Sequence, residues 1–161
     1  MTPNNVFSDE WDEGFPPVPG WTFKSRRLVP GRRSLGMCLY ELPPGQRQPI
    51  YHFHHGNEEL VLVLRGTPTL RTPEGERELQ EGDAVHFPVG PGGAHQLINP
   101  SDEPALYVIA ASHAFPEAIE YPDSGKVAVN SAEESQRGGR LWTIHRLQDD
   151  VDYFDGEHRE I

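Results

Sequence analysis

Glycine and proline interrupt this 161-residue chain so often that short strands fit between them better than helices. Turn-forming residues recur from Gly31 to Gly93, and the runs between them contain clusters of β-branched and aromatic residues. The pattern predicts strands at 22–29, 34–42, 50–55, 59–64, 68–72, 76–79, 84–87, 94–98, 105–111 and 141–147. A regular series of short strands with tight turns is typical of an all-β sandwich or barrel.

Helical signals are nearly absent from the chain. Ser131 stands three residues before Glu134, in the register of a capping box, and predicts one helical turn over 131–135. We expect the stretch 118–126 to form a surface loop, although it could also close over the mouth of a barrel.

Acidic residues are concentrated at the two ends of the chain. The formal net charge is −11, from 14 Lys and Arg against 25 Asp and Glu. Residues 1–20 carry four acidic residues and no basic one, and the last fifteen residues carry six acidic residues and one arginine. The body between them is nearly neutral. This balance disfavours a protein that binds nucleic acid or anionic membranes, because both are polyanions.

Cysteine content and the first residues bear on the compartment. Cys38 is the only cysteine, so neither an intrachain disulfide nor a zinc site built from several cysteines can form. No apolar stretch approaches the roughly 20 residues of a membrane helix. Residues 1–7 lack a basic start followed by an apolar block. We therefore expect a cytoplasmic protein.

The run of alternating Leu and Val at 60–64 is apolar on both faces of its predicted strand. A small barrel buries only the inner face, so the outer face needs another cover. We expect a second subunit to provide it and the protein to be a homodimer. The alternative is that the first twenty residues cover this face within one chain.

Four residues have the types and spacing of a metal site. His52 and His54 flank Phe53 in a predicted strand, and the period of two places both imidazoles on one face. Glu59 opens the next strand after a turn, and His95 opens a later one. Imidazoles with one carboxylate suit Fe, Mn, Ni, Zn, Co or Cu better than Mg or Ca.

Two motifs in the chain resemble those of the cupin family. The first cupin motif is Gly, five residues, His-x-His, three or four residues, Glu, six residues and Gly. Here Gly45 is followed by six residues, His52-Phe53-His54, four residues, Glu59, six residues and Gly66. The second motif is Gly, five residues, Pro-x-Gly, two residues, His, three residues and Asn. Its counterpart here is Gly82, five residues, Pro88-Val89-Gly90, four residues, His95, three residues and Asn99.

The resemblance covers roughly residues 34–112 and implies a fold and a ligand set. It implies an all-β cupin barrel, a double-stranded β-helix or jelly roll, with extended N- and C-terminal arms. We expect an acidic arm at 1–20, the barrel at 21–112 with its core motifs at 45–99, and a C-terminal extension at 113–161 with one further strand and an acidic tail. In cupins, the residues matching His52, His54, Glu59 and His95 bind one divalent metal ion. Asn99 is expected to hold a turn.

Three further residues are weak catalytic candidates. Arg65 is in phase with Glu59 and could bind an anionic group bidentately, or form a salt bridge at the rim if the strand ends before it. Tyr40 could be a phenol in the pocket or an ordinary packing residue. His86 could be a general base, but a hydrogen-bonded barrel histidine is favoured.

Cupins of this size catalyse different reactions, so the fold does not decide the function. We expect a small polar metabolite as ligand or substrate. Isomerisation of a sugar or sugar phosphate is slightly favoured over metal-dependent dioxygenation. A binding or sensor protein without catalysis is the third alternative, and it would show ligand-dependent stability without turnover.

Overall fold

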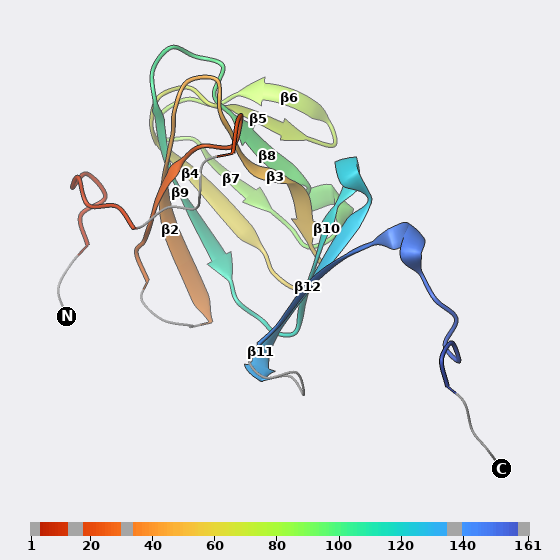
Figure 1. Ribbon diagram of the computed structural model, residues 1–161. Helices are drawn as coiled ribbons and strands as arrows, with labels where there is room; N and C mark the ends of the chain where they lie inside the picture. Colours follow the sequence, from red (N-terminus) through yellow and green to blue (C-terminus); the bar gives the residue numbers. More distant parts are fainter. Residues whose placement is uncertain (1–3, 13–17, 30–33, 135–139, 158–161) are drawn as a thin grey trace.

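The computed structural model describes residues 4–12, 18–29, 34–134 and 140–157, which form two antiparallel sheets (Figure 1). The five-stranded sheet has the order β1 (Lys24–Arg27), β2 (Leu35–Leu42), β9 (Ala105–Ser112), β4 (Glu59–Arg65) and β7 (Ala84–Phe87). The seven-stranded sheet has the order β12 (Arg140–Arg146), β11 (Lys126–Glu134), β10 (Glu117–Tyr121), β3 (Arg47–His54), β8 (His95–Ile98), β5 (Thr69–Thr72) and β6 (Gly75–Glu78). Three short 3-10 helices accompany them, at Pro91–Gly93, Pro122–Ser124 and Leu147–Asp149. Among the described residues, no helix has the length and apolarity needed to cross a bilayer.

All ten predicted strands are present, but two strands were not predicted. The stretch 118–126 is not a surface loop. Here β10 pairs with Phe53 and His54 at the C-terminal end of β3, and a turn at Pro122–Ser124 leads into β11. The expected helical turn at 131–135 is also wrong over its described part. There β11 continues to Glu134, which pairs with Arg140 of β12. Residue 135 lies outside the described residues.

The two sheets enclose one apolar core. Side chains from both sheets meet in it: Leu42, Val61, Val63, Leu70, Leu79, Phe87, Leu97, Tyr107 and Ile109. Burial alternates along β4, since Val61 and Val63 are at most 1% exposed whereas Leu60, on the outer face that was expected to be covered, is 39% exposed. Beyond residue 112 the chain adds three strands, rather than one, to the seven-stranded sheet. In Figure 1, β11 and β12 extend past the barrel and the blue C-terminal segment runs away from it.

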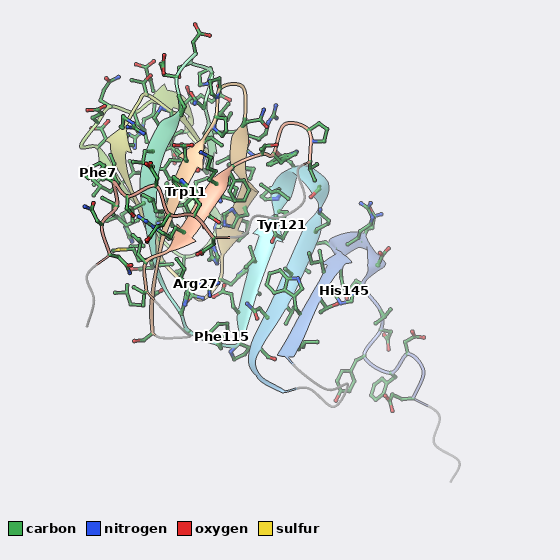
Figure 2. The ribbon with its side chains drawn as sticks, turned by 60° about the vertical axis from the view of Figure 1, so that its left-hand side comes forward. Phe7, Trp11, Arg27, Phe115, Tyr121 and His145 are labelled. Atoms are coloured by element: carbon green, nitrogen blue, oxygen red, sulfur yellow. The ribbon has the colours of Figure 1, made fainter. Side chains whose placement is uncertain are left out.

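The N-terminal arm covers part of the outer face of the five-stranded sheet. Val6 and Trp11 pack against the cluster of Leu39, Leu106 and Val108, and Leu64 joins the same cluster. Figure 2 shows Trp11 lying over this sheet. The N-terminal arm therefore covers the apolar outer face of β4 at its Leu64 end. Cover by the arm was the expected alternative to cover by a second subunit. A homodimer stays a prediction.

Arg26 attaches this arm to the barrel. It is 6% exposed, points to the outer side of β1 and contacts the Ser8 hydroxyl. It also donates to the Asn5 carbonyl at 2.6 Å and lies 3.9 Å from the Glu10 carboxylate. The backbone N–H of Asp12 donates to the Ser25 carbonyl at 2.9 Å, and the Asp12 carboxylate accepts from the backbone N–H of Arg27 at 2.9 Å. The arm is therefore bonded to three consecutive residues of β1.

Replacing Arg26 with Ala should release the arm and destabilise the fold. Hydrogen bonds to a charged group contribute about 1.5–3 kcal/mol each, so we expect the free energy of unfolding in urea to fall by about 2 kcal/mol. Arg27→Ala is the matched control, because the neighbouring side chain is exposed and lies on the opposite face of β1 from Arg26. Equal losses in the two variants would contradict this role of Arg26.

Candidate metal centre

Three strands bring four predicted ligands to one point inside the barrel. His52 and His54 lie on one face of β3, Glu59 begins β4, and His95 begins β8 directly opposite His52. The Glu59 Oε2 atom lies 3.1 Å from Nε2 of His95, 3.5 Å from Nε2 of His54 and 3.8 Å from Nε2 of His52. The Nε2 atoms of His52 and His54 are 3.1 Å apart. Ligand atoms of His52, His54 and Glu59 all lie within 4.8 Å of one another.

Both departures from the motif spacing fall where the backbone is irregular. The extra residue before His52 lies in a stretch of β3 where the pairing with β8 shifts register between Gln48 and His52. The two extra residues before His95 are taken up by the 3-10 turn Pro91–Gly93. Gly93 is required there, because a Cβ atom would lie 1.8 Å from the Pro88 carbonyl oxygen. The insertions leave His52 and His95 opposite each other on neighbouring strands.

Each imidazole is oriented by a contact of its other nitrogen. Nδ1 of His52 lies 2.8 Å from the Ile50 carbonyl oxygen, and Nδ1 of His95 lies 2.9 Å from that of Gly93. Nδ1 of His54 lies 3.5 Å from a carboxylate oxygen of Glu117. An Nδ1–H that donates outward leaves the lone pair of Nε2 directed at the common point, which is how metal-binding histidines are usually held.

Burial and pairing set the charges of this group. Burial, with the nearby His95, lowers the pKa of His52 to about 3, so this ring is neutral at neutral pH. Burial alone would raise the pKa of Glu59, but the adjacent His54 and His95 outweigh it and hold that pKa well below its usual range. Burial likewise opposes the charged form of His54, yet the pairing with Glu59 prevails and raises its pKa. Glu59 Oε2 and His95 Nε2 are buried without a hydrogen bond. A cation placed between them would satisfy both atoms, so the residues fit a metal ion.

A polar cavity opens from this point toward β10 and β11. It has a volume of about 460 Å³, and its polar lining includes Arg27, His54, Glu59, His113, Glu117 and Asn130. A second cavity of about 230 Å³ adjoins it and shares Arg27, Glu59 and His113. His54 and Glu59, two of the four converging residues, therefore line a space that is large enough for a small metabolite.

Comparison with known proteins identifies the family. The family profile described as "Cupin domain" matches residues 38–110, which contain all four predicted ligands. The chain belongs to the cupin superfamily. The predicted fold, an all-β cupin barrel of the type-2 group, is therefore confirmed.

Solved structures similar to this cupin include two proteins named for sugar phosphate isomerisation. A protein from Acidithiobacillus ferrooxidans, provisionally named a sugar phosphate isomerase, is 26% identical with a TM-score of 0.72, over 83% of this chain and 82% of its own. A sugar phosphate isomerase of the cupin superfamily from Silicibacter pomeroyi is also 26% identical, with a TM-score of 0.68 and the same coverage. A polyketide cyclase from Streptomyces resistomycificus shares the fold at 21% identity and a TM-score of 0.59, over 73% of this chain and 83% of its own. A comparison with curated protein sequences found no match.

The three weak candidates lie in different places in the cupin. Tyr40 lies inside the barrel and lines the smaller cavity with Glu59. Arg65 lies at the other end of β4 from Glu59, is exposed, and borders a shallow hollow under the N-terminal arm. His86 is exposed on the outer side of β7, with Nε2 3.4 Å from the Glu58 carboxylate, so the favoured interpretation as a barrel histidine is wrong. Only Tyr40 is brought to the site.

Three other residues of the cavity were missed by sequence reasoning. Glu117 is 3% exposed on β10 and accepts from the backbone N–H groups of His55 and Gly56 at 3.2 and 3.3 Å. Arg27 and His113 line both cavities. The one available signal was the alternation of Glu117, Ala118 and Ile119, which is that of a half-buried strand. Asn99 does hold a turn, as expected, by donating to the Leu42 and Glu103 carbonyls at 2.8 Å.

The pKa of His52 predicts how stability depends on pH in the metal-free cupin. Between pH 6.5 and 4.5 the unfolded chain protonates His52, whereas the folded protein, with a His52 pKa of about 3, does not. The free energy of unfolding should therefore decrease as the pH falls through this window. Glu59, whose pKa is lowered, reduces the free energy of unfolding only when the pH falls below its usual pKa of 4.5. His54, whose pKa is raised, keeps its stabilising contribution throughout the window.

Urea unfolding of chelator-treated protein at several pH values in this window measures how steeply the free energy of unfolding changes with pH. His52→Gln should flatten this dependence, and His86→Gln, which changes an exposed histidine, should keep it. Identical slopes in the wild type and His52→Gln would show that His52 is not buried and neutral.

Proposed function

We propose that this cupin binds one divalent transition metal ion through His52, His54, Glu59 and His95 and isomerises a small polyhydroxy compound, a sugar or sugar phosphate. The observation that carries the proposal is the convergence of three Nε2 atoms and one carboxylate oxygen while each Nδ1 is turned outward. Nitrogen and carboxylate donors favour Fe, Mn, Ni, Zn, Co or Cu. When bound, such an ion polarises a substrate oxygen as a Lewis acid.

Tyr40 supplies a hydrogen-bond donor to the substrate. Burial is the largest cause that raises the pKa of Tyr40 far above its usual value, and the nearby Cys38 and Glu59 carboxylate add to it. The phenol therefore stays protonated and cannot serve as a base near neutral pH. It can donate to a substrate oxygen in the smaller cavity.

His113 is the group that accepts and returns a proton. Among the described residues, it is the one imidazole outside the four converging residues that lines both cavities with Glu59. Its ring lies over Gly36, where an added Cβ atom would come within 2.4 Å of Cε1 of His113. In an aldose–ketose isomerisation a proton leaves the carbon next to the carbonyl and returns to the former carbonyl carbon, so one base acting twice can carry it. The hydroxyl proton of the deprotonated carbon moves to the former carbonyl oxygen through solvent water.

Two similarities support an isomerase over the other reactions. The proteins from Acidithiobacillus ferrooxidans and Silicibacter pomeroyi, each matched over 82% of its length, carry the name sugar phosphate isomerase. The polyketide cyclase, at 21% identity, informs the fold alone. The isomerase reaction also needs a base in the cavity, and His113 provides one.

Metal content should depend on the four proposed ligands. We expect the purified wild type to hold close to one ion per chain and His52→Ala to lose most of it. Glu117→Gln should weaken metal affinity by about 10- to 100-fold, the usual effect of removing the partner of a metal-bound histidine. His86→Ala should retain the ion. Elemental analysis of all four proteins, prepared in parallel, tests this, and equal metal content in the wild type and His52→Ala would refute the ligand assignment.

Isomerisation through a carbon-bound proton should incorporate solvent deuterium. In D2O, the metal-loaded cupin mixed with pentose or hexose phosphates should place deuterium on the carbon next to the carbonyl, as seen by proton NMR. His113→Gln should slow exchange by about 100- to 10,000-fold, the usual contribution of a general base. His86→Gln should exchange at the wild-type rate. Undiminished exchange in His113→Gln would remove His113 from the mechanism, and no exchange with any sugar would contradict the isomerase.

A further inference from the structure

We infer that Arg27 binds the phosphate group of a phosphorylated substrate at the outer end of the cavity whose inner end is the metal centre. This rests on the proposed function, which left a sugar and a sugar phosphate as alternatives, and it selects the sugar phosphate. Arg27 is the one arginine that lines the two cavities around Glu59 among the described residues.

The pairing of β1 with β2 fixes which way Arg27 points. Arg26 is opposite Leu39, and Arg27 is opposite Cys38. Because side chains alternate along a strand, Arg26 and Leu39 face the N-terminal arm, whereas Arg27 and Cys38 face the cavity that both line. Two consecutive arginines therefore have opposite surroundings.

The partners of the two arginines differ as much as their directions. The guanidinium of Arg26 is buried and bonded to the arm. Arg27 is bonded through its backbone N–H, which donates to the Asp12 carboxylate at 2.9 Å. None of the ion pairs found among the described residues includes its guanidinium, and the side chain is exposed to solvent. Figure 2 shows Arg27 and Phe115 at the end of the barrel where strands of the C-terminal extension meet it. Arg27 is thus free to bind an anion at the cavity mouth.

The charge of the cavity also favours an anionic ligand. Its ionised side chains are the carboxylates of Glu59 and Glu117 and the guanidinium of Arg27. With a divalent ion at the metal centre, one net positive charge remains, although the whole chain carries −11. A phosphate monoester carries about −1.5 to −2 at neutral pH and offers oxygens in the geometry that a guanidinium binds bidentately.

Arg65 offers a matched control, because anion binding was one of the two roles that the sequence left open for it. Both arginines are exposed and end a strand of the five-stranded sheet. Arg65, however, borders the hollow formed with Val6, Phe7 and Ser8, remote from the cavity around Glu59. Removing its charge changes the net charge of the protein by the same amount as removing that of Arg27.

Binding of matched sugars measures the inference without relying on catalysis. Calorimetric titration of the Mn-loaded wild type with ribose 5-phosphate against ribose, and glucose 6-phosphate against glucose, gives the preference for the phosphate in each pair. We expect the wild type to prefer at least one phosphate by tenfold or more. Arg27→Gln should lose tenfold or more of that preference, Arg27→Lys should lose less, and Arg65→Gln should keep it. Metal content and thermal unfolding are measured on the same samples.

The outcomes separate this inference from the proposed function. No phosphate preference in either pair, or an equal loss in Arg27→Gln and Arg65→Gln, would overturn the role of Arg27 even if the ion is bound and exchange occurs. An intact preference in a folded Arg27→Gln would do the same. A protein without metal that still prefers the phosphate through Arg27 would support the inference and overturn the metal-dependent function.

Discussion

The pairing of His52 with His95 across β3 and β8 is the constraint on which the rest of the site depends. It places two imidazoles side by side, with ring centroids 4.7 Å apart, and the strand period then adds His54 on the same side. Neighbouring strands complete the set, because β4 begins with Glu59 and β10, beside β3, begins with Glu117. A slip of one residue in β3 would turn both histidines out of the barrel. The register of this sheet therefore decides which residues converge.

The polar centre lies against an apolar core, and this explains its electrostatics. His95 stacks on Phe87 with ring centroids 3.8 Å apart, and Val61, two residues after Glu59, is fully buried. Charges in such surroundings are costly unless they are paired. The low pKa of His52, the lowered pKa of Glu59 and the unbonded Nε2 of His95 all follow from placing these groups together. A divalent ion would convert this costly arrangement into a satisfied one.

Much of the fold and the four converging residues could be predicted from the sequence, because strand period, turns and motif spacing are local properties. The residues that shape the cavity could not. Glu117 depends on β10, a short strand whose hydrogen bonds come from β3 and β11. Arg65 was in phase with Glu59 by simple alternation, but a register shift between Val63 and Arg65 breaks that phase, and the strand end carries the side chain away from the site. The direction of Arg27 follows only from the pairing of β1 with β2.

X-ray absorption at the cobalt edge of the Co-loaded protein tests the central claim most directly, since it reports the atoms around the ion itself. Three imidazole ligands and a carboxylate oxygen predict clear multiple-scattering features from three rings, reduced to two rings in His95→Ala. A spectrum with oxygen ligands alone, or one unchanged in His95→Ala, would contradict a metal centre built from His52, His54, Glu59 and His95.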